Sequence, residues 1–372
     1  MADDATNRVL IAGLAMARAL HRRGMPGLVL ERRADVAEAG LAINLPGNAV
    51  QALAQLGLAD ALGQVGSPIR RREYRTERGR LLFAVDEGAF WGARAHPRCV
   101  RRGDLLRLLA DGLPADAVRR GRAVAAIRQS AGDVSVELAD GAVERGGWLV
   151  GADGVHSAVR RSVFGEAAPS PALLGQASWR FMARNPGLDA WTLWAGAGGL
   201  FLLIPVDRDE VYGWASVGGA GAAGRDLAAV RRVFDRFPQP VQDTLDRILL
   251  RPDAIHHSPL EEVRVAHWTE GRVLLMGDAA HATAPVWAQG AALALEDALV
   301  LAGLLAGGGD RDGIGPAYEA LRRPRVGHIQ AMTDRLSRTA TMPDWARNLL
   351  LPLIGPRSYR ATYAKLRVPV SA

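Results

Sequence analysis

Strand-like and helix-like patterns of apolar residues alternate at the start of the chain. The apolar run at 9–12 predicts a buried strand, the spacing over 15–23 predicts a helix, and the run at 28–30 predicts a second strand. Apolar and polar residues then alternate over 134–138 and 143–150, which predicts a hairpin. These blocks predict an α/β body that begins with a strand–helix–strand unit.

The pattern changes between about residues 172 and 219, where short aromatic runs are separated by glycine-containing turns. This is typical of an antiparallel sheet. An apolar helix is expected at 291–305, too short to cross a bilayer and interrupted by two carboxylates. The C-terminal part is expected to be helical around 317–336, with a proline-broken segment at 349–353.

These patterns divide the chain into four parts. Residues 1–171 form the first part of an α/β domain, with a β-excursion at 69–100. Residues 172–265 form the antiparallel-sheet domain, 266–313 return to the α/β domain, and 314–372 form the C-terminal helical segment. At 372 residues the chain is long enough for one large α/β body and a second sheet that shares its core.

Composition narrows the functional class. The chain is 49% hydrophobic and 23% charged, as in an ordinary globular protein, and no targeting or membrane-spanning segment is visible, so we expect a cytoplasmic protein without a membrane partner. Its net charge of +7 comes almost entirely from scattered arginines, with Lys365 as the one lysine, which argues against a nucleic-acid partner. The lone Cys99 excludes an internal disulfide and a cysteine metal cluster, and no metal site is expected.

Residues 272–297 are the most informative segment. They combine a buried strand, a glycine turn with one carboxylate, a loop, and a long apolar helix that opens at Gln289 and Gly290. The first N–H groups of a helix lack partners within it, and the helix dipole favours negative charge there, so the pyrimidine edge of a reduced flavin suits this end. Asp278 can accept a hydrogen bond from a ribityl hydroxyl. A plain strand–turn–helix with a capping aspartate is the alternative.

This segment resembles the second FAD motif of the class A flavoprotein aromatic hydroxylases, the group of p-hydroxybenzoate and salicylate hydroxylases. Residues 151–160 are similar to the middle motif of that family, 102–105 to its arginine-containing helix start, and 9–13 with 29–31 to the two ends of its Rossmann-like unit. The resemblance covers the chain from about residue 8 to its end. It implies a Rossmann-like FAD-binding domain, an antiparallel-sheet substrate domain and a helical C-terminal part.

The resemblance also implies roles for single residues. Glu31 accepts hydrogen bonds from the adenosine ribose, Arg102 offsets phosphate charge, Pro285 lies beside the isoalloxazine, and the backbone at Gln289 and Gly290 stabilises the reduced flavin. The expected FAD-binding set is Gly13, Glu31, Arg32, Arg102, Asp153, Asp278, Pro285, Gln289, Gly290 and Ala291.

The glycine loop that should hold the FAD pyrophosphate is missing. A dinucleotide fold needs G-x-G-x-x-G between its first strand and helix, whereas here Gly13 alone stands for both ends of the loop. Three explanations are open: mobile residues absent from the recorded chain, a natural deletion, or an engineered one. We favour the first, because the flanks are intact and loops that wrap a ligand tend to disorder without it. The other two would leave weak or no FAD binding.

Candidate substrate contacts are aromatic or polar residues of the expected second sheet and of the flavin motif. Alternate residues of a strand face the same side, so Trp179 and Phe181 share one face and Arg180 takes the other. Arg180 can bind a carboxylate or phenolate. The candidate pocket residues are Trp179, Arg180, Tyr212, Trp214 and Trp287.

One departure from the family pattern lies in the flavin motif. Ala288 stands where the family has glycine in P-x-x-G-Q-G, and its methyl group is expected to crowd the flavin. The neighbouring Trp287 is also unusually bulky and is expected to narrow the pocket.

We interpret the chain as an FAD-dependent monooxygenase for an aromatic or electron-rich small molecule. The resemblance implies that NADH or NADPH reduces the flavin, that O2 adds to it, and that a C4a-hydroperoxide delivers one oxygen atom. No catalytic base is identified, and the protein is expected to be a monomer or homodimer. The alternatives are a related flavoprotein epoxidase or oxidase in natural-product metabolism, or a non-catalytic relative if the deletion at Gly13 is real.

Overall fold

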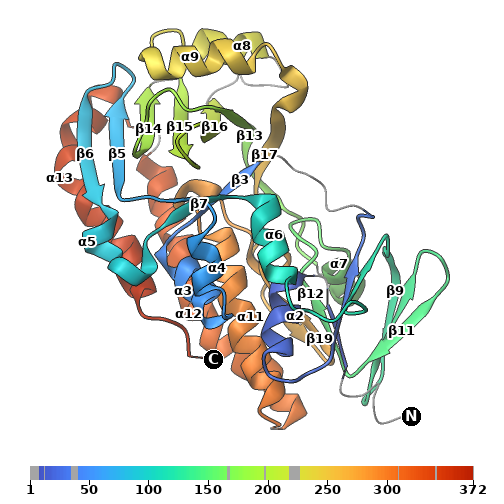
Figure 1. The fold of residues 1–372 in the computed structure, drawn as a ribbon. Helices are drawn as coiled ribbons and strands as arrows, with labels where there is room; N and C mark the ends of the chain where they lie inside the picture. The colour runs from blue at the N-terminus through green and yellow to red at the C-terminus, as the bar shows by residue number, and fades with distance from the viewer. Residues whose placement is uncertain are drawn as a thin grey trace.

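The computed structural model describes residues 8–11, 13–34, 41–165, 168–196, 198–217, 227–308, 310–339 and 342–371. Within these ranges the chain forms the expected α/β body with a second large sheet beside it (Figure 1). No helix there combines the length and the apolar character that crossing a membrane requires.

A six-stranded sheet forms the centre of the α/β body. Its strand order is β18-β19-β12-β1-β2-β8, and every neighbouring pair is parallel except β18 with β19. The three strands β1, β12 and β19 are buried throughout, as expected for a parallel sheet covered on both faces. The strands are β1 (Val9–Ile11), β2 (Gly27–Glu31), β8 (Val118–Arg120), β12 (Trp148–Gly151), β18 (Thr269–Glu270) and β19 (Val273–Leu275).

Helices and short sheets pack around this body. The long helix α11 (Gly290–Ala306) contacts α2 (Leu14–His21) and α3 (Gly47–Gln55), so segments nearly 300 residues apart in sequence share one core (Figure 1). The remaining elements of the body are α4 (Ala59–Gly63), α6 (Arg102–Ala110), α7 (Ala158–Phe164), α10 (Asp278–His281), β3 (Ala42–Leu45), β4 (Ser67–Pro68), β7 (Arg98–Arg101), β9 (Val124–Gln129), β10 (Val134–Leu138), β11 (Val143–Gly146), and the 3-10 turns η5 (Pro285–Trp287) and η6 (Arg311–Gly313).

The expected hairpin after residue 134 forms only in part. Strands β10 and β11 pair as predicted, with Gly141 at the turn in a left-handed conformation (φ 83°). The chain then breaks at Gly147, and β12 leaves the hairpin to lie beside β1 in the central sheet. The apolar pattern at 143–150 therefore covers two strands in two different sheets.

The second large sheet has seven strands in the order β17-β13-β16-β15-β14-β5-β6. The excursion expected at 69–100 is part of it, because β5 pairs in parallel with β14. Strand β17 begins at the pair His256 and His257 and lies at one edge of this sheet. The strands are β5 (Arg71–Thr76), β6 (Leu81–Asp86), β13 (Ala172–Arg184), β14 (Trp191–Gly196), β15 (Gly199–Pro205), β16 (Glu210–Val217) and β17 (His256–Glu262).

The two faces of this sheet have different neighbours. Trp179, Phe181 and Trp194 form a hydrophobic core with α8 (Leu227–Val233) and α9 (Gln239–Ile248), which lie at the top of Figure 1. The opposite face turns toward the α/β body, where Trp191 and Ile204 pack with the buried Cys99. Strands β13, β14, β15 and β16 thus present one set of residues to α8 and α9 and the alternate set to the opposite face.

The C-terminal part is helical, as expected, but longer and less interrupted. Helix α12 spans Ile314–Thr339, and α13 spans Asp344–Tyr363 and contacts β6; η7 (Ala364–Arg367) follows. The expected proline break is wrong, because α13 continues through Pro352 and Pro356. A Cβ at Gly355 would lie 2.3 Å from the Phe83 ring, so this close approach to β6 holds the proline-containing stretch in place. Short elements elsewhere are α5 (Glu87–Trp91), η1 (Ala93–Ala95) and η4 (Pro252–Ala254).

Candidate active site

The turn after β19 places a carboxylate in front of α11. Gly277 has a left-handed backbone (φ 56°), and a Cβ there would lie 3.0 Å from the Ala294 Cβ of α11, so both the turn and the packing require glycine. Asp278 follows, and one of its carboxylate oxygens lies 3.6 Å from the position of a Cβ at Gly290. The expected neighbours of the flavin, Asp278 and the N-terminus of α11, are therefore together.

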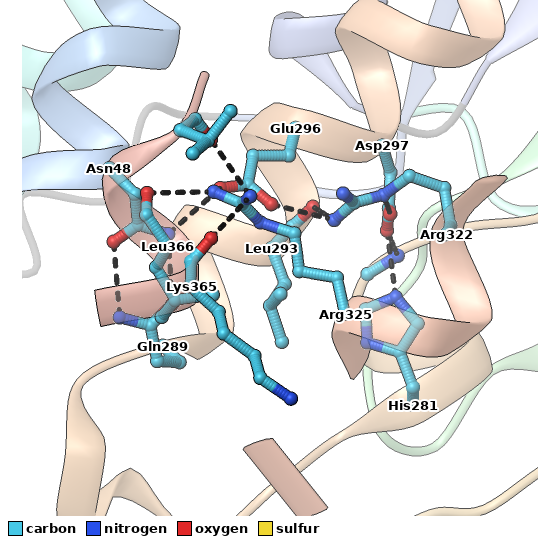
Figure 2. Close-up of polar contacts among 12 residues, drawn as sticks. Asn48, His281, Gln289, Leu293, Glu296, Asp297, Arg322, Arg325, Lys365 and Leu366 are labelled. Atoms are coloured by element: carbon cyan, nitrogen blue, oxygen red, sulfur yellow. Dashed lines mark hydrogen bonds and ion pairs between the residues drawn. The ribbon is translucent and has the colours of Figure 1, made fainter. Parts of the chain in front are cut away.

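The side chains around the N-terminus of α11 leave its first backbone N–H groups available to a ligand. No side chain caps the helix, and the first N–H groups, including that of Ala291, have no acceptor within it. The Gln289 side chain points into the core, where it exchanges two hydrogen bonds with the Asn48 side chain at 3.0 and 3.1 Å (Figure 2). Only the backbone of Gln289 and Gly290 remains to face a ligand, as the family pattern implied.

A buried ion-pair network supports this turn from behind (Figure 2). Asp297 of α11 accepts a hydrogen bond from the Gly277 N–H at 2.9 Å and pairs with His281 Nε2 and Arg322 Nε, each at 2.7 Å. Burial opposes the charged form, but His281 and Arg322 outweigh it and hold the pKa of the Asp297 carboxyl well below its usual range. His281 thus ties the loop after β19 to α11.

A second carboxylate ties α11 to the C-terminal segment. Glu296 accepts hydrogen bonds from Asn48 Nδ2 at 2.9 Å and Arg325 Nη2 at 2.8 Å, and it pairs with Arg322 at 2.9 Å. Arg325 also donates to the backbone carbonyls of Leu366 and Val368, each at 2.9 Å (Figure 2). Sequence reasoning noted both carboxylates as interruptions of an apolar helix; their partners on α12 were missed.

The middle motif also supports the turn. Asp153 accepts from the Ala158 N–H at 2.7 Å and from the Ser157 hydroxyl at 2.5 Å, so it holds the start of α7. Arg160, 1% exposed, donates to the carbonyls of Val155 and Ala279, each at 2.7 Å. Because Ala279 follows Asp278, Arg160 fixes the backbone next to that carboxylate.

Arg180 and Tyr212 lie on the sheet face that turns toward the α/β body, together with Trp214. Arg180 pairs in register with Trp214 on β16, and Met182 with Tyr212 one row further. In the described part of the chain, the half-buried Arg180 guanidinium makes no hydrogen bond or ion pair. The buried Trp214 indole N–H also has no acceptor there. The indole N–H groups of Trp179 and Trp287 likewise lack an acceptor in the described ranges, so it is the unpaired guanidinium of Arg180 that distinguishes this face.

The other two candidate pocket residues lie elsewhere. Trp179 is on the opposite face of the same sheet, in the core under α8 and α9. Trp287 is 6% exposed and packs edge-on against Tyr363, whose hydroxyl donates to the Trp287 carbonyl at 2.7 Å. Both side chains fill hydrophobic cores, so the structure brings together only Arg180, Tyr212 and Trp214 of the predicted pocket.

Charges link this sheet face to the flavin motif. Desolvation by surrounding protein raises the pKa of Asp278, and the positive charges of Arg102 and Arg180 act in the opposite direction. Burial likewise raises the pKa of Tyr212 to about 12, against the same two guanidinium groups. The positive charges of Arg102 and Arg180 thus act on the pKa of both Asp278 and Tyr212.

The connection between β1 and α2, where the FAD pyrophosphate was expected to bind, is short. Strand β1 ends at Ile11 and α2 begins at Leu14, with Gly13 as the residue before the helix. Because the full sequence contains this two-residue connection, we take it as the chain's own. Glu31 lies at the end of β2 as expected, where its carboxylate accepts from the Arg33 N–H at 2.8 Å, and Arg32 is exposed beside it.

These residues fit the flavin ring and ribityl chain of FAD better than its pyrophosphate. The uncapped N-terminus of α11, with Asp278 before it, suits the pyrimidine and ribityl groups, and Pro285 is exposed next to it. Arg102 is exposed at the start of α6 without an ion-pair partner in the described ranges. A hollow of about 440 Å³ between β6, α5 and α13 contains none of the residues of either flavin motif.

Comparison with known proteins agrees with this geometry. The FAD binding domain family matches residues 11–333. The chain is 30% identical to 2-heptyl-3-hydroxy-4(1H)-quinolone synthase of Pseudomonas aeruginosa, over 96% of this chain and 95% of that protein. It is 31% identical to 3-amino-4-hydroxybenzoate 2-monooxygenase of Streptomyces cremeus, over 90% and 86%. The structure of Klebsiella pneumoniae HpxO with FAD and uric acid superposes with a TM-score of 0.81 at 28% identity, covering 97% and 92%.

Proposed function

Because the chain belongs to the FAD binding domain family and is an FAD-dependent monooxygenase, we propose that it hydroxylates a planar aromatic molecule that carries an anionic oxygen atom. The observation that carries the choice of substrate is Arg180. Its guanidinium group is half-buried, has no partner among the described residues, and is close enough to Asp278 to influence its pKa.

The named relatives support a flat substrate with oxygen substituents. Their names refer to a quinolone, an aminohydroxybenzoate and urate, which all contain planar rings. Apolar and aromatic side chains surround Arg180 on the same sheet face, with Trp214 beside it and Tyr212 in the next row. A flat ring packs well against such side chains, and a carboxylate or phenolate on it pairs with the guanidinium.

The chain's own residues contribute binding, orientation and exclusion of water. When bound, a flavin reduced by NAD(P)H would supply the electrons for splitting O2, with one oxygen atom going to the substrate ring and the other leaving as water. In this proposal Asp278 would accept a hydrogen bond from a ribityl hydroxyl, and the N-terminus of α11 would stabilise the negative charge of the reduced ring. Arg180 and Trp214 would hold the substrate.

Several features of the reaction setting are part of the same proposal. One dinucleotide-type sheet is present in the described ranges, so we expect NADH or NADPH to bind transiently at the flavin. O2 is the co-substrate, and we expect the enzyme to work in the cytoplasm as a monomer or homodimer. The extent of the two parts of the FAD-binding domain, 1–171 and 266–313, is proposed on the same basis, with β5 and β6 assigned to the substrate sheet.

Exchange of Arg180 tests the proposal. Arg180→Met removes a charge-assisted hydrogen bond to the substrate, which contributes about 1.5–3 kcal/mol, so KM for an aromatic acid or phenol should rise roughly 10- to 100-fold. The measurement is NAD(P)H oxidation by the FAD-loaded enzyme, stimulated by each member of a panel of aromatic carboxylates, phenols and neutral rings.

Arg184→Met is the matched control. Arg184 is exposed and lies on the same strand and face, four residues further along β13. We expect this variant to keep the KM of the unaltered enzyme. Equal losses in both variants, or preference for neutral rings over anionic ones in the unaltered enzyme, would show that Arg180 does not select the substrate.

A further inference from the structure

The two ends of the FAD site are supported very unequally. The flavin end has a buried network behind it: Asp297 holds the Gly277 N–H at 2.9 Å, and both Asp297 and the Arg322 that pairs with it are at most 1% exposed. The Gln289–Asn48 amide pair fixes the residue that precedes α11. Ligand contacts at this end are therefore held in place by the fold.

The pyrophosphate end lacks the corresponding support. A glycine loop between strand and helix presents several backbone N–H groups to two phosphates. Here only two residues separate Ile11 from Leu14, and the sequence has no G-x-G-x-x-G in this region. Gly13 is in an extended conformation, and a Cβ there would lie 3.3 Å from the Ala152 Cβ, so Gly13 lies directly beside the residue that follows β12.

Among the described residues, the remaining candidate contacts for the adenosine half are two exposed arginines and the half-buried Glu31. Arg32 and Arg102 are both exposed, and the Glu31 carboxylate is already engaged by the Arg33 N–H. Exposed ion pairs contribute little to binding, because water and salt screen them and long side chains lose freedom. Among the described residues, the backbone that would meet the phosphates and adenosine thus has no buried network behind it, whereas the backbone at the flavin end has one.

From this difference we propose that the chain recognises the flavin and ribityl end alone, and that riboflavin, FMN and FAD bind with similar affinity. This inference rests on the proposed function for the location of the flavin site. Contacts that do not distinguish the three flavins cannot generate a preference among them. It follows that riboflavin and FMN in solution compete with FAD for the site.

The test is an equilibrium titration of the flavin-free protein with riboflavin, FMN and FAD, followed by flavin fluorescence. We expect the three Kd values to agree within about tenfold, less than one charge-assisted hydrogen bond would produce. A Kd for FAD at least about 100-fold below that for riboflavin would overturn the inference, because it would demonstrate a working pyrophosphate site.

An insertion makes the test independent of the absolute affinities. Placing Gly-Ala-Gly-Ile-Ala between Ala12 and Gly13 completes G-x-G-x-x-G with Gly13 as its last glycine. We expect this variant to bind FAD at least tenfold more tightly while its Kd for riboflavin is unchanged. The matched insertion Ser-Ala-Ser-Ile-Ala, of the same length without the glycines, should leave all three Kd values unchanged, and circular dichroism checks that both variants fold.

The outcomes separate this inference from the proposed function. If FAD binds much more tightly than riboflavin and NAD(P)H reduces the bound flavin, the proposed monooxygenase function stands. The inference of similar affinities for the three flavins is then wrong. Failure of every flavin to bind both the unaltered chain and the glycine insertion variant contradicts both. Loss of affinity for all three flavins in Asp278→Asn, by similar factors, would support recognition through the shared ribityl end.

Discussion

At the scale of single residues, Ala288 shows how a departure from the family pattern is accommodated. It is the one non-glycine residue with positive φ in the described ranges, at φ 53° and ψ 33°. The left-handed region costs an L-residue about 1–2 kcal/mol. Its position between Trp287 and Gln289 shows why the family has glycine there: the turn into α11 needs this conformation.

Ala288→Gly should therefore stabilise the protein by about 1 kcal/mol, less the small entropic cost that glycine adds in the unfolded chain. The measurement is the denaturant midpoint of unfolding. Ala361→Gly is the matched control: Ala361 is exposed within α13, and glycine there should destabilise by about 0.5–1 kcal/mol. If both exchanges shift the midpoint in the same direction, Ala288 is not strained.

Sequence reasoning placed some residues better than others. Asp278, Gln289 and Gly290 lie where the motif put them, because a strand, a glycine turn and a helix start are local features. Trp179 and Trp287 were selected for their residue type, but burial decides their role, and burial depends on which helices cover a face. The face shared by Trp179 and Phe181 was predictable; the helices α8 and α9 that cover it were not.

At the scale of elements, α11 is held by charges inside its apolar sequence. Glu296 and Asp297 are at most 1% exposed and pair with Arg322 and Arg325 of α12. The sequence pattern shows only an apolar helix interrupted by two carboxylates. The arginine partners lie 25 residues after Asp297 and 29 residues after Glu296, and the packing of α12 on α11 brings them together. Such pairs are beyond what spacing in a sequence reveals.

Breaking this network should cost much stability. Asp297→Asn leaves Arg322 and His281 without their shared carboxylate, and removal of one partner from a buried pair costs about 3–5 kcal/mol. Because the folded pKa of Asp297 is lowered, its stabilisation is complete above the usual value of about 4 and is lost as the pH falls through the folded pKa.

The measurement is urea unfolding of the unaltered protein and Asp297→Asn at several pH values. The difference between them should be largest near neutral pH and should shrink below about pH 4. Asp312→Asn removes a side chain that is 91% exposed and serves as the control, with little expected effect at any pH. A pH-independent difference would show that Asp297 is not ionised in the folded protein.

At the scale of the whole molecule, the flavin motif and the proposed substrate face belong to two different sheets. Asp278 follows a strand of the central sheet, and Arg180 and Tyr212 lie on the face of the seven-stranded sheet that turns toward the α/β body. The α/β class and the family followed from the sequence and are confirmed. The pairing of β5 with β14 was missed, because it joins strands more than 100 residues apart and leaves no local pattern.

The central claim is that this chain is a flavin-dependent monooxygenase despite its short β1–α2 connection. The most direct measurement is the visible absorption spectrum of the purified protein with excess FAD, before and after removal of oxygen and addition of NAD(P)H. We predict that the flavin bands shift on mixing and bleach with NAD(P)H, and that the bands return when O2 is admitted. Bands that stay identical to those of free FAD at every protein concentration would contradict the account and would favour a non-catalytic relative.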